Sequence, residues 1–136
     1  MRKIASIASI ALGVIMVLAA GGTWWMVSST LADQKITTSD DACLPERPVK
    51  GPFTAYCQAQ IIDEHTLERT DGLRYAELDR EDPRRETALT SSFLQSSLFT
   101  SVVSFGVAAM AAAVGVLFIL IGLGMWDVAK RTDPTA

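Results

Sequence analysis

Two long apolar stretches without a single ionisable side chain constrain what this chain can fold into. The first runs from Ile4 to Val27 and the second from Leu98 to Trp126. Each exceeds the roughly 20 residues that a helix needs to cross about 30 Å of hydrocarbon. We therefore expect an all-α membrane protein, in which two transmembrane helices form an antiparallel hairpin around a small, mostly helical external region.

These stretches divide the chain into five expected segments. They are a cytoplasmic tail at 1–3, a transmembrane helix at 4–27, an external loop at 28–92, a second helix at 93–126 that starts at the outer membrane edge, and a cytoplasmic tail at 127–136. Both tails are short and carry Lys and Arg, namely Arg2 and Lys3 in the first and Lys130 and Arg131 in the second, and such tails stay in the cytoplasm, whereas a long loop translocates largely regardless of its charge. The expected location is the plasma membrane, with both termini cytoplasmic and the loop outside. Trp24 and Trp25 would then lie at the outer interface and Trp126 at the inner one.

A cleaved signal peptide is the alternative interpretation of the first stretch. Met1-Arg2-Lys3 resembles a basic leader, and Thr30-Leu31-Ala32 offers a small-x-Ala cleavage pattern. The apolar run of about 24 residues is longer than the usual 7–15 residues of a signal peptide. We therefore expect a retained anchor, and cleavage would leave one span with the loop still outside.

Small residues recur along both apolar stretches at alternating steps of three and four. The row in the second stretch consists of Ser97, Ser101, Ser104, Ala108, Ala111 and Gly115, and Gly122 resumes it after Phe118. The row in the first consists of Ser6, Ser9, Gly13, Met16, Ala20 and Thr23. Because membrane helices associate through small residues, and a repeat near 3.5 keeps one seam toward a partner, these rows predict that the two helices pack on each other.

A second set of residues is predicted to contact a foreign partner. Gly106, Ala109 and Ala113 form a further small row on another face of the second stretch. No helix breaker occurs from Pro83 to Trp126, so a helix of about 44 residues, roughly 66 Å long, would project outside the membrane. Its outer half carries an apolar stripe of Leu89, Phe93, Leu94, Leu98 and Val102. Such a stripe needs a cover, either a helix of the loop or a partner subunit.

Within the loop, the sequence predicts one further helix. Residues 28–52 are rich in Ser, Thr, Asp and Pro and indicate irregular structure. Pro52 suits a first helical turn, and Gly72 suits the end of a helix at about 53–70. Asp82-Pro83 is a strong start signal for the long helix, with Asp82 as the N-cap.

Cys43 and Cys57 are the two cysteines, and both fall in the external loop. Thiols outside the cell are driven to disulfides. A bond between them would close a loop of about 15 residues, and this restriction of the unfolded chain is worth roughly 3 kcal/mol. Two free thiols are the alternative.

The sequence offers no recognisable catalytic, cofactor or metal site. His65 is the single histidine, and the acids around it do not form a known ligand set, since zinc needs three or four convergent ligands. A non-haem iron triad requires two histidines. No phosphate-binding loop, dinucleotide motif or basic stripe for nucleic acid is present. We therefore expect no enzyme activity, no cofactor, no nucleic-acid partner and no small-molecule substrate.

Part of the chain resembles a known family. The resemblance rests on Phe53-Thr54-Ala55-Tyr56, on Tyr75-Ala76-Glu77-Leu78-Asp79-Arg80-Glu81-Asp82-Pro83, and on the segment from Ala88 to Gly106. These resemble small two-span membrane proteins of actinobacteria, whose members often carry the label aromatic ring-opening dioxygenase. The resemblance implies an actinobacterial plasma membrane, but the iron ligands that the label requires are missing here, and it implies no catalytic residue.

The function expected from these features is that of a non-catalytic accessory or assembly subunit of a larger membrane complex. Its partners would be membrane lipids and other membrane subunits, and a respiratory bc–oxidase supercomplex is a candidate host by class alone. The alternatives are an external sensor or ligand-binding module, which the short tail after Trp126 disfavours, and a self-associating structural protein.

Overall fold

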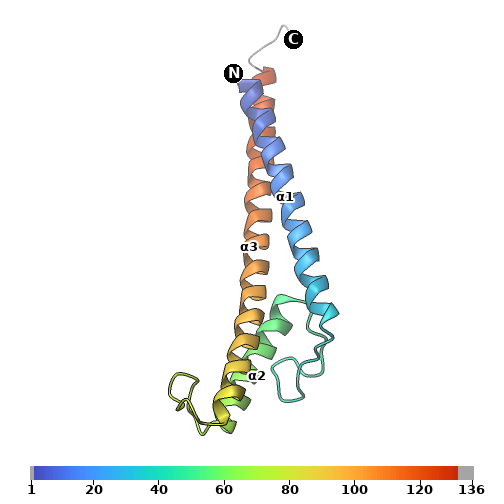
Figure 1. Ribbon diagram of the computed structural model, residues 1–136. Coiled ribbons are helices and arrows are strands. Elements are labelled where there is room, and N and C mark those ends of the chain that lie inside the picture. Colours follow the sequence, from blue (N-terminus) through green and yellow to red (C-terminus); the bar gives the residue numbers. More distant parts are fainter. Residues whose placement is uncertain (1, 132–136) are drawn as a thin grey trace. The chain divides into compact units, whose positions relative to one another are not determined.

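The computed structural model describes residues 2–131, and its regular structure consists of three helices. These are α1 (Arg2–Asp33), α2 (Pro52–Arg69) and α3 (Arg84–Arg131) (Figure 1). Residues 2–131 contain no β-strand beyond an isolated antiparallel bridge between Thr37 and Pro48. The expected all-helical class is therefore confirmed. Met1 and residues 132–136 of the expected tails lie outside the described residues.

The helices α1 and α3 are each long and apolar enough to cross a membrane. In the most apolar window of each helix only 17% is buried inside the protein. Large side chains such as Leu18 and Met110 are 70% and 63% exposed. A core helix of a soluble protein would hide such side chains, whereas exposed apolar surface of this extent is compatible with a membrane location.

The chain divides into two compact units. The helix-pair unit comprises Met1–Trp25 and Gly106–Ala136, and the core unit comprises Met26–Phe105. The helix-pair unit therefore holds the larger part of both apolar stretches. The core unit holds the end of α1, the loops, α2 and the first turns of α3.

The end of α1 differs from the prediction, because the helix continues through residues 28–33, which were expected to be irregular. The Ser29 and Thr30 hydroxyls donate hydrogen bonds to the Met26 carbonyl at 2.9 and 2.8 Å. These polar side chains therefore have acceptors within the helix and do not interrupt it. Leu31 is buried in the core, which gives the extra turn an apolar contact. The helices expected at about 53–70 and from about 83 begin at Pro52 and Arg84.

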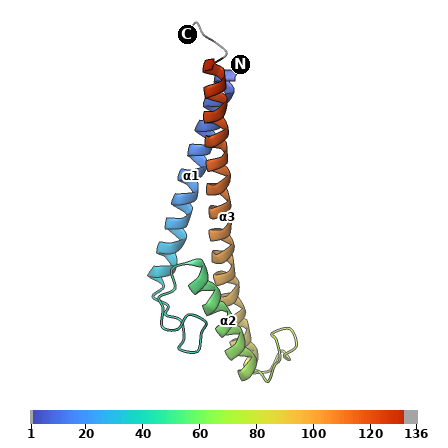
Figure 2. The same ribbon diagram turned by 180° about the vertical axis from the view of Figure 1, so that it is seen from behind.

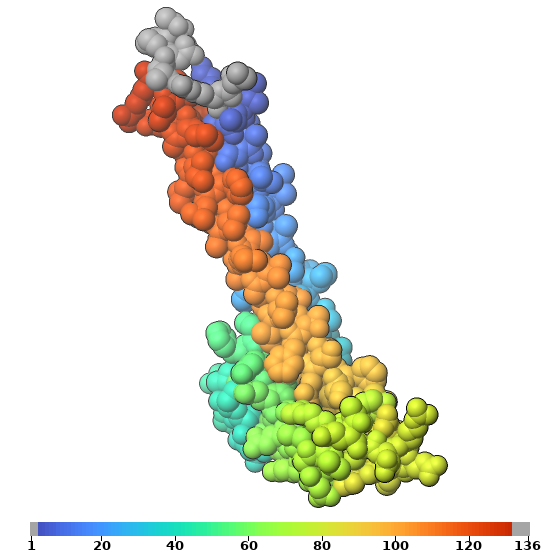
Figure 3. Space-filling view, turned by 90° about the vertical axis from the view of Figure 1, so that its left-hand side faces the viewer, coloured from blue at the N-terminus to red at the C-terminus, as the bar shows by residue number. Residues whose placement is uncertain are grey.

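The hydrophobic cluster of the core unit draws on all three helices. It consists of Leu31, Val49, Ala55, Ala59, Leu98 and Phe105. The alanines of α2 allow close approach to its neighbours, and the space-filling view shows these segments, coloured cyan to orange, packed against one another (Figure 3). At its start, α2 is capped by Thr54, whose hydroxyl accepts from the Gly51 amide at 3.2 Å.

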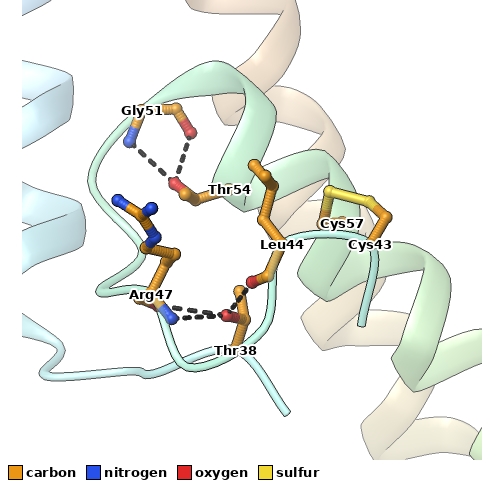
Figure 4. The surroundings of a disulfide bond; sticks show 7 residues. All are labelled: Thr38, Cys43, Leu44, Arg47, Gly51, Thr54 and Cys57. Carbon is orange, nitrogen blue, oxygen red and sulfur yellow. Dashed lines mark hydrogen bonds between the residues drawn. A yellow bond between two sulfur atoms is a disulfide. The ribbon is translucent and has the colours of Figure 1, made fainter. Parts of the chain in front are cut away.

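A disulfide between Cys43 and Cys57 ties the loop of residues 34–50 to α2 (Figure 4). The two Cα atoms are 5.4 Å apart, within the normal range for a disulfide. Inside the same loop, the buried Thr38 hydroxyl accepts from the Arg47 amide at 2.9 Å and donates to the Leu44 carbonyl. The loop is therefore ordered although it has no helix or strand.

Arginine side chains hold the loop between α2 and α3. Arg74 forms a two-pronged ion pair with Asp63 of α2, with distances of 2.6 and 3.1 Å. Arg84 pairs with Asp71 at 2.7 Å, and the guanidinium of Arg85 lies 4.2 Å from the centre of the Tyr75 ring. Arg84 and Arg85 in the first turn of α3 thus hold this loop by an ion pair and a ring contact, since the loop has few apolar side chains of its own.

This arrangement predicts a loss of stability in acid. Hydrogen bonds from Arg74 lower the pKa of Asp63 below its ordinary value of 3.8. A carboxyl whose pKa is lower in the folded state stabilises the fold above its unfolded pKa, and this stabilisation is lost as pH falls through the folded value. Chemical denaturation of the purified protein between pH 6 and pH 2 should therefore show the unfolding free energy falling from about pH 4 downward.

The matched variants for this experiment are Asp63→Asn and Glu64→Gln, which remove the same charge from neighbouring positions of α2. Asp63→Asn should lower stability at neutral pH and weaken its dependence on acid. Glu64→Gln, at an exposed position, should leave both close to those of the wild type. Identical pH profiles for Asp63→Asn and the wild type would contradict the assignment.

The outward face of α2 changes in character along the helix. Its exposed positions are Phe53, Tyr56, Gln60, Glu64, Glu68 and Arg69, in chain order. The Tyr56 ring meets the Phe99 ring of α3 edge to face, with centroids 6.1 Å apart. The face is therefore aromatic where α2 begins and charged where it ends.

Candidate functional site

In the helix-pair unit, α1 and α3 are joined by hydrogen bonds from serine hydroxyls. Ser6, which is fully buried, donates to the Gly122 carbonyl at 2.6 Å. One turn further along α1, Ser9 donates to the Phe118 carbonyl at 2.8 Å. The partner numbers fall as the α1 numbers rise, so the paired segments run in opposite directions (Figures 1 and 2).

Three glycines bring the two backbones into contact. A Cβ on Gly13 would lie 2.5 Å from the Gly115 carbonyl oxygen and 2.9 Å from the Ile119 amide nitrogen. A Cβ on Gly115 would lie 2.8 Å from the Gly13 carbonyl oxygen. A Cβ on Gly122 would lie 2.6 Å from a side-chain carbon of Ile10. Since real Cβ atoms do not approach this closely, these positions accept only glycine in the present packing.

Burial in this unit follows a seven-residue period. The buried positions are Ser6, Gly13 and Ala20 on α1, and Ala108, Gly115, Gly122 and Ala129 on α3. Ala111 is half-buried between two of them. A seven-residue period is the geometry of left-handed helix pairs. Ser6, Gly13, Gly115 and Gly122 therefore lie on the α1–α3 contact, and the buried Ala20, Ala108 and Ala129 continue the same period along the two helices.

Two predicted seam residues, Ser101 and Ser104, belong to the core unit and have different surroundings. Both are half-buried, and both donate their hydroxyls to their own helix, at 3.1 Å to Ser97 and 2.8 Å to Thr100. They line a groove that also involves α2. The sequence row is continuous, but its outer end faces this groove.

The second small row of α3 stays open. Gly106, Ala109 and Ala113 are all exposed. A Cβ built on Gly106 would have nothing within 4 Å apart from its own helix. Within the described part of the chain, Gly106 thus has no contact that would account for its lack of a side chain.

The outer stripe of α3 is only partly covered. Leu98 is buried in the core cluster with Ala55 and Ala59 of α2, and Leu89 is half-buried. Phe93 and Leu94 are 68% and 46% exposed. The helix that the sequence suggested as a cover therefore reaches Leu98 but leaves the two preceding apolar residues in contact with solvent.

The side chains of His65, Asp41 and the two cysteines make contacts within the protein. His65 forms a hydrogen bond with Asp41 at 2.6 Å, and both are exposed. The two cysteines are consumed by the disulfide. Among residues 2–131, no group of three or more His, Cys, Asp or Glu residues is placed to hold a metal ion.

Comparisons with known proteins add no relative to this description. A scan against protein-family models, a search of curated proteins and a search of solved structures each find no match to the chain. The family resemblance of the sequence therefore stays a prediction.

Proposed function

We propose that this protein is a non-catalytic subunit of a larger plasma-membrane complex. In this proposal α1 and α3 span the bilayer as a hairpin, and the second small row of α3 packs against a helix of a partner. The core unit lies outside the cell. The observation that carries the proposal is the open row Gly106, Ala109 and Ala113 beside a seam whose glycines are already used within the chain.

The open row has a physical cost that a partner helix would offset. Glycine in a helix interior is about 1 kcal/mol less favourable than alanine. In lipid, small residues permit two backbones to approach closely, and this packing drives helix association. Among residues 2–131, Gly106 gains no such contact, so the approach of a second helix would give this residue a role.

The proposed orientation is supported at both ends of the molecule. The disulfide between Cys43 and Cys57 would persist in an oxidising compartment, which supports an external location of the core unit. At the opposite end of α3, the Lys130 ammonium lies 5.7 Å from the centre of the Trp126 ring. A tryptophan and a lysine together are typical of the cytoplasmic membrane interface.

The test is purification of the tagged protein from its native membrane in a mild detergent. The informative variant is Gly106→Leu, and Val107→Leu is the matched control because it also changes an exposed position of α3. The wild type and Val107→Leu should recover the same membrane subunits in constant ratio, identified by mass spectrometry. Gly106→Leu should lose them at least tenfold, because a large side chain separates the helices.

Two outcomes would contradict the proposal. Recovery of the wild type only as a monomer would leave no partner for the open row. Recovery as a dimer of identical chains that Gly106→Leu dissociates would instead establish a self-associating structural protein.

A further inference from the structure

The core unit carries exposed cations beside the start of α2, and neither the helix pair nor the open row explains them. They are Lys35, Arg47 and Lys50. The Lys50 amide donates to the Thr54 hydroxyl in the first turn of α2 at 3.2 Å, and the Lys50 carbonyl accepts from the Ser28 hydroxyl of α1 at 2.7 Å. Since Ser28 directly follows the first apolar stretch, Lys50 lies at the level where α1 would leave the membrane.

Backbone hydrogen bonds hold the other two cations at the same end of the loop. The Val49 amide donates to the Ile36 carbonyl at 2.9 Å, and the Thr38 amide donates to the Arg47 carbonyl at 2.9 Å. These bonds pair the segment that follows α1 with the segment that precedes α2, and Lys35 is the neighbour of one paired residue. Figure 4 shows the Arg47 side chain extending from the loop toward the start of α2.

Charge is sorted along this loop. Residues 38–46 form its other end, and their charged side chains are the acids Asp40, Asp41 and Glu46. Asp41 forms its hydrogen bond with His65, which lies three turns beyond the start of α2. At the end near the apolar stretches, the three cations are accompanied by a single acid, Asp33. The loop is therefore positive toward the proposed membrane and negative away from it.

Exposed aromatic rings accompany the cations. Phe53 and Tyr56 belong to the first turns of α2, directly after Lys50, and both are exposed. The Tyr56 ring contacts Phe99, which is the second residue of the second apolar stretch. The rings therefore lie at the level where α3 would enter the membrane. Aromatic side chains are enriched at this level because they are stable among lipid headgroups.

From this arrangement we propose that the core unit docks on the headgroups of anionic phospholipids, of the chemistry of phosphatidylglycerol. The docking surface, the basic–aromatic face, consists of Lys35, Arg47, Lys50, Phe53 and Tyr56. Its cations bind the phosphate groups, and its rings lie between the headgroups and the first carbons of the acyl chains. The inference rests on the membrane insertion proposed above, and it does not require the partner subunit.

Charge complementarity selects this occupant. Each Lys or Arg near an anionic membrane surface strengthens attachment roughly fivefold, and the effect falls off within about 10 Å. Docking through the cationic end of the loop also keeps the acids of residues 38–46 away from the lipid phosphates. A zwitterionic headgroup layer would gain little from this arrangement, because it has no net charge.

The test uses the full-length protein in phosphatidylcholine vesicles with one of two lipid probes. Both probes carry the same photoreactive group near the top of an acyl chain, and the headgroup is that of phosphatidylglycerol or of phosphatidylcholine. The phosphatidylglycerol probe should label peptides within residues 34–56 at least about fivefold more strongly. Concentrated salt should reduce this difference, because it screens exposed charges. Peptide mapping separates this label from any that Lys130 and Arg131 attract at the other end of α3.

Lys50→Glu and Arg80→Glu form a matched pair of charge reversals at exposed positions. Arg80 lies before the start of α3, whose apolar stretch begins only at Leu98, roughly 20 Å along the helix. Lys50→Glu should lower labelling by the phosphatidylglycerol probe at least about fivefold, and Arg80→Glu should not. The hydrogen bonds of Lys50 use its backbone, so the variant should keep its fold, and an intact disulfide on a non-reducing gel checks this.

Phe53→Ser and Phe93→Ser test the aromatic part of the face. Both rings are exposed, but Phe93 precedes Phe99 by nearly two turns of α3 and so lies farther from the proposed membrane. Phe53→Ser should lower labelling by both probes by the same factor, because a ring inserts beside any acyl chain. Lys50→Glu should affect the anionic probe alone, and Phe93→Ser should affect neither.

Three results would overturn the inference. They are equal labelling of Lys50→Glu and the wild type by the anionic probe, an equal loss in Arg80→Glu, and equal labelling of the wild type by both probes. If Lys50→Glu loses co-purified subunits while its lipid labelling is unchanged, the face binds an acidic protein instead. Alkaline extraction of the vesicles separates these failures from that of the proposed function. A protein that resists extraction but shows one of these results is inserted without a lipid-docking face, whereas an extracted protein is not inserted at all.

Discussion

Gly13→Ala is expected to destabilise the pairing of α1 and α3 by about 1–3 kcal/mol, although alanine is the better helix former. The added methyl group would lie 2.5 Å from the Gly115 carbonyl oxygen and 2.9 Å from the Ile119 amide nitrogen. Because both are backbone atoms, neither can move without shifting a helix. The two helices must therefore separate by a fraction of an ångström, and the hydrogen bonds of Ser6 and Ser9 will lengthen.

Gly22→Ala is the control for this substitution, since it lies on the same helix and has nothing within 4 Å of its Cβ position. It should be neutral or stabilising by up to about 1 kcal/mol. Both variants can be compared by titrating SDS into mixed micelles and following tryptophan fluorescence. Effects of the same sign and size at the two positions would show that the glycine seam is not a packing contact.

Removal of the disulfide with Cys43→Ser and Cys57→Ala is expected to destabilise the core unit by about 3 kcal/mol. The bond closes a loop over a sequence separation of 14 residues, and its loss frees the unfolded chain to explore more conformations. Alanine suits the second position because Cys57 is buried at 5% exposure and a hydroxyl there would lose its water. Thermal unfolding should show a lower Tm.

Limited proteolysis locates this effect. Without the disulfide, cleavage should appear first within residues 34–50, where the remaining order depends on the hydrogen bonds of Thr38 and on Val49 in the core. Reduction of the wild type in sealed vesicles by a thiol reagent that does not cross membranes should give the same pattern if the loop is external. An unchanged pattern after confirmed removal of the bond would mean that the loop is held by its other contacts.

The parts of the fold that the sequence predicts well are those with local causes. Pro52 at the start of α2 and Asp82 before α3 act within a turn of their own positions, and the Asp82 carboxylate accepts from the Arg84 amide at 2.9 Å. The disulfide follows from having two cysteines in one loop. The Ser6–Gly122 contact follows from a periodicity that is visible along each helix separately.

The features that the sequence does not reveal depend on contacts between distant segments. Residues 28–33 have the polar composition that is typical of a loop. The hydroxyls of Ser29 and Thr30, however, donate hydrogen bonds to the Met26 carbonyl of the same helix, and Leu31 packs in the core. Ser101 and Ser104 continue the seam in sequence, yet α2 makes them part of a groove. The grouping of the three loop cations depends on backbone bonds between residues 36–38 and 47–49, and the composition of the loop does not reveal it.

The change of polarity along the outward face of α2 has a consequence for the depth of the protein in the bilayer. The Tyr56–Phe99 contact places the aromatic end of α2 beside the part of α3 that would enter the membrane. Aromatic rings are most stable at the headgroup level, and carboxylates are stable only in water. Sinking by one turn would carry Gln60 and then Glu64 toward hydrocarbon, and rising would draw Phe53 and Tyr56 into water. With α3 inserted, α2 would therefore oppose vertical displacement in both directions, even in bilayers of different thickness.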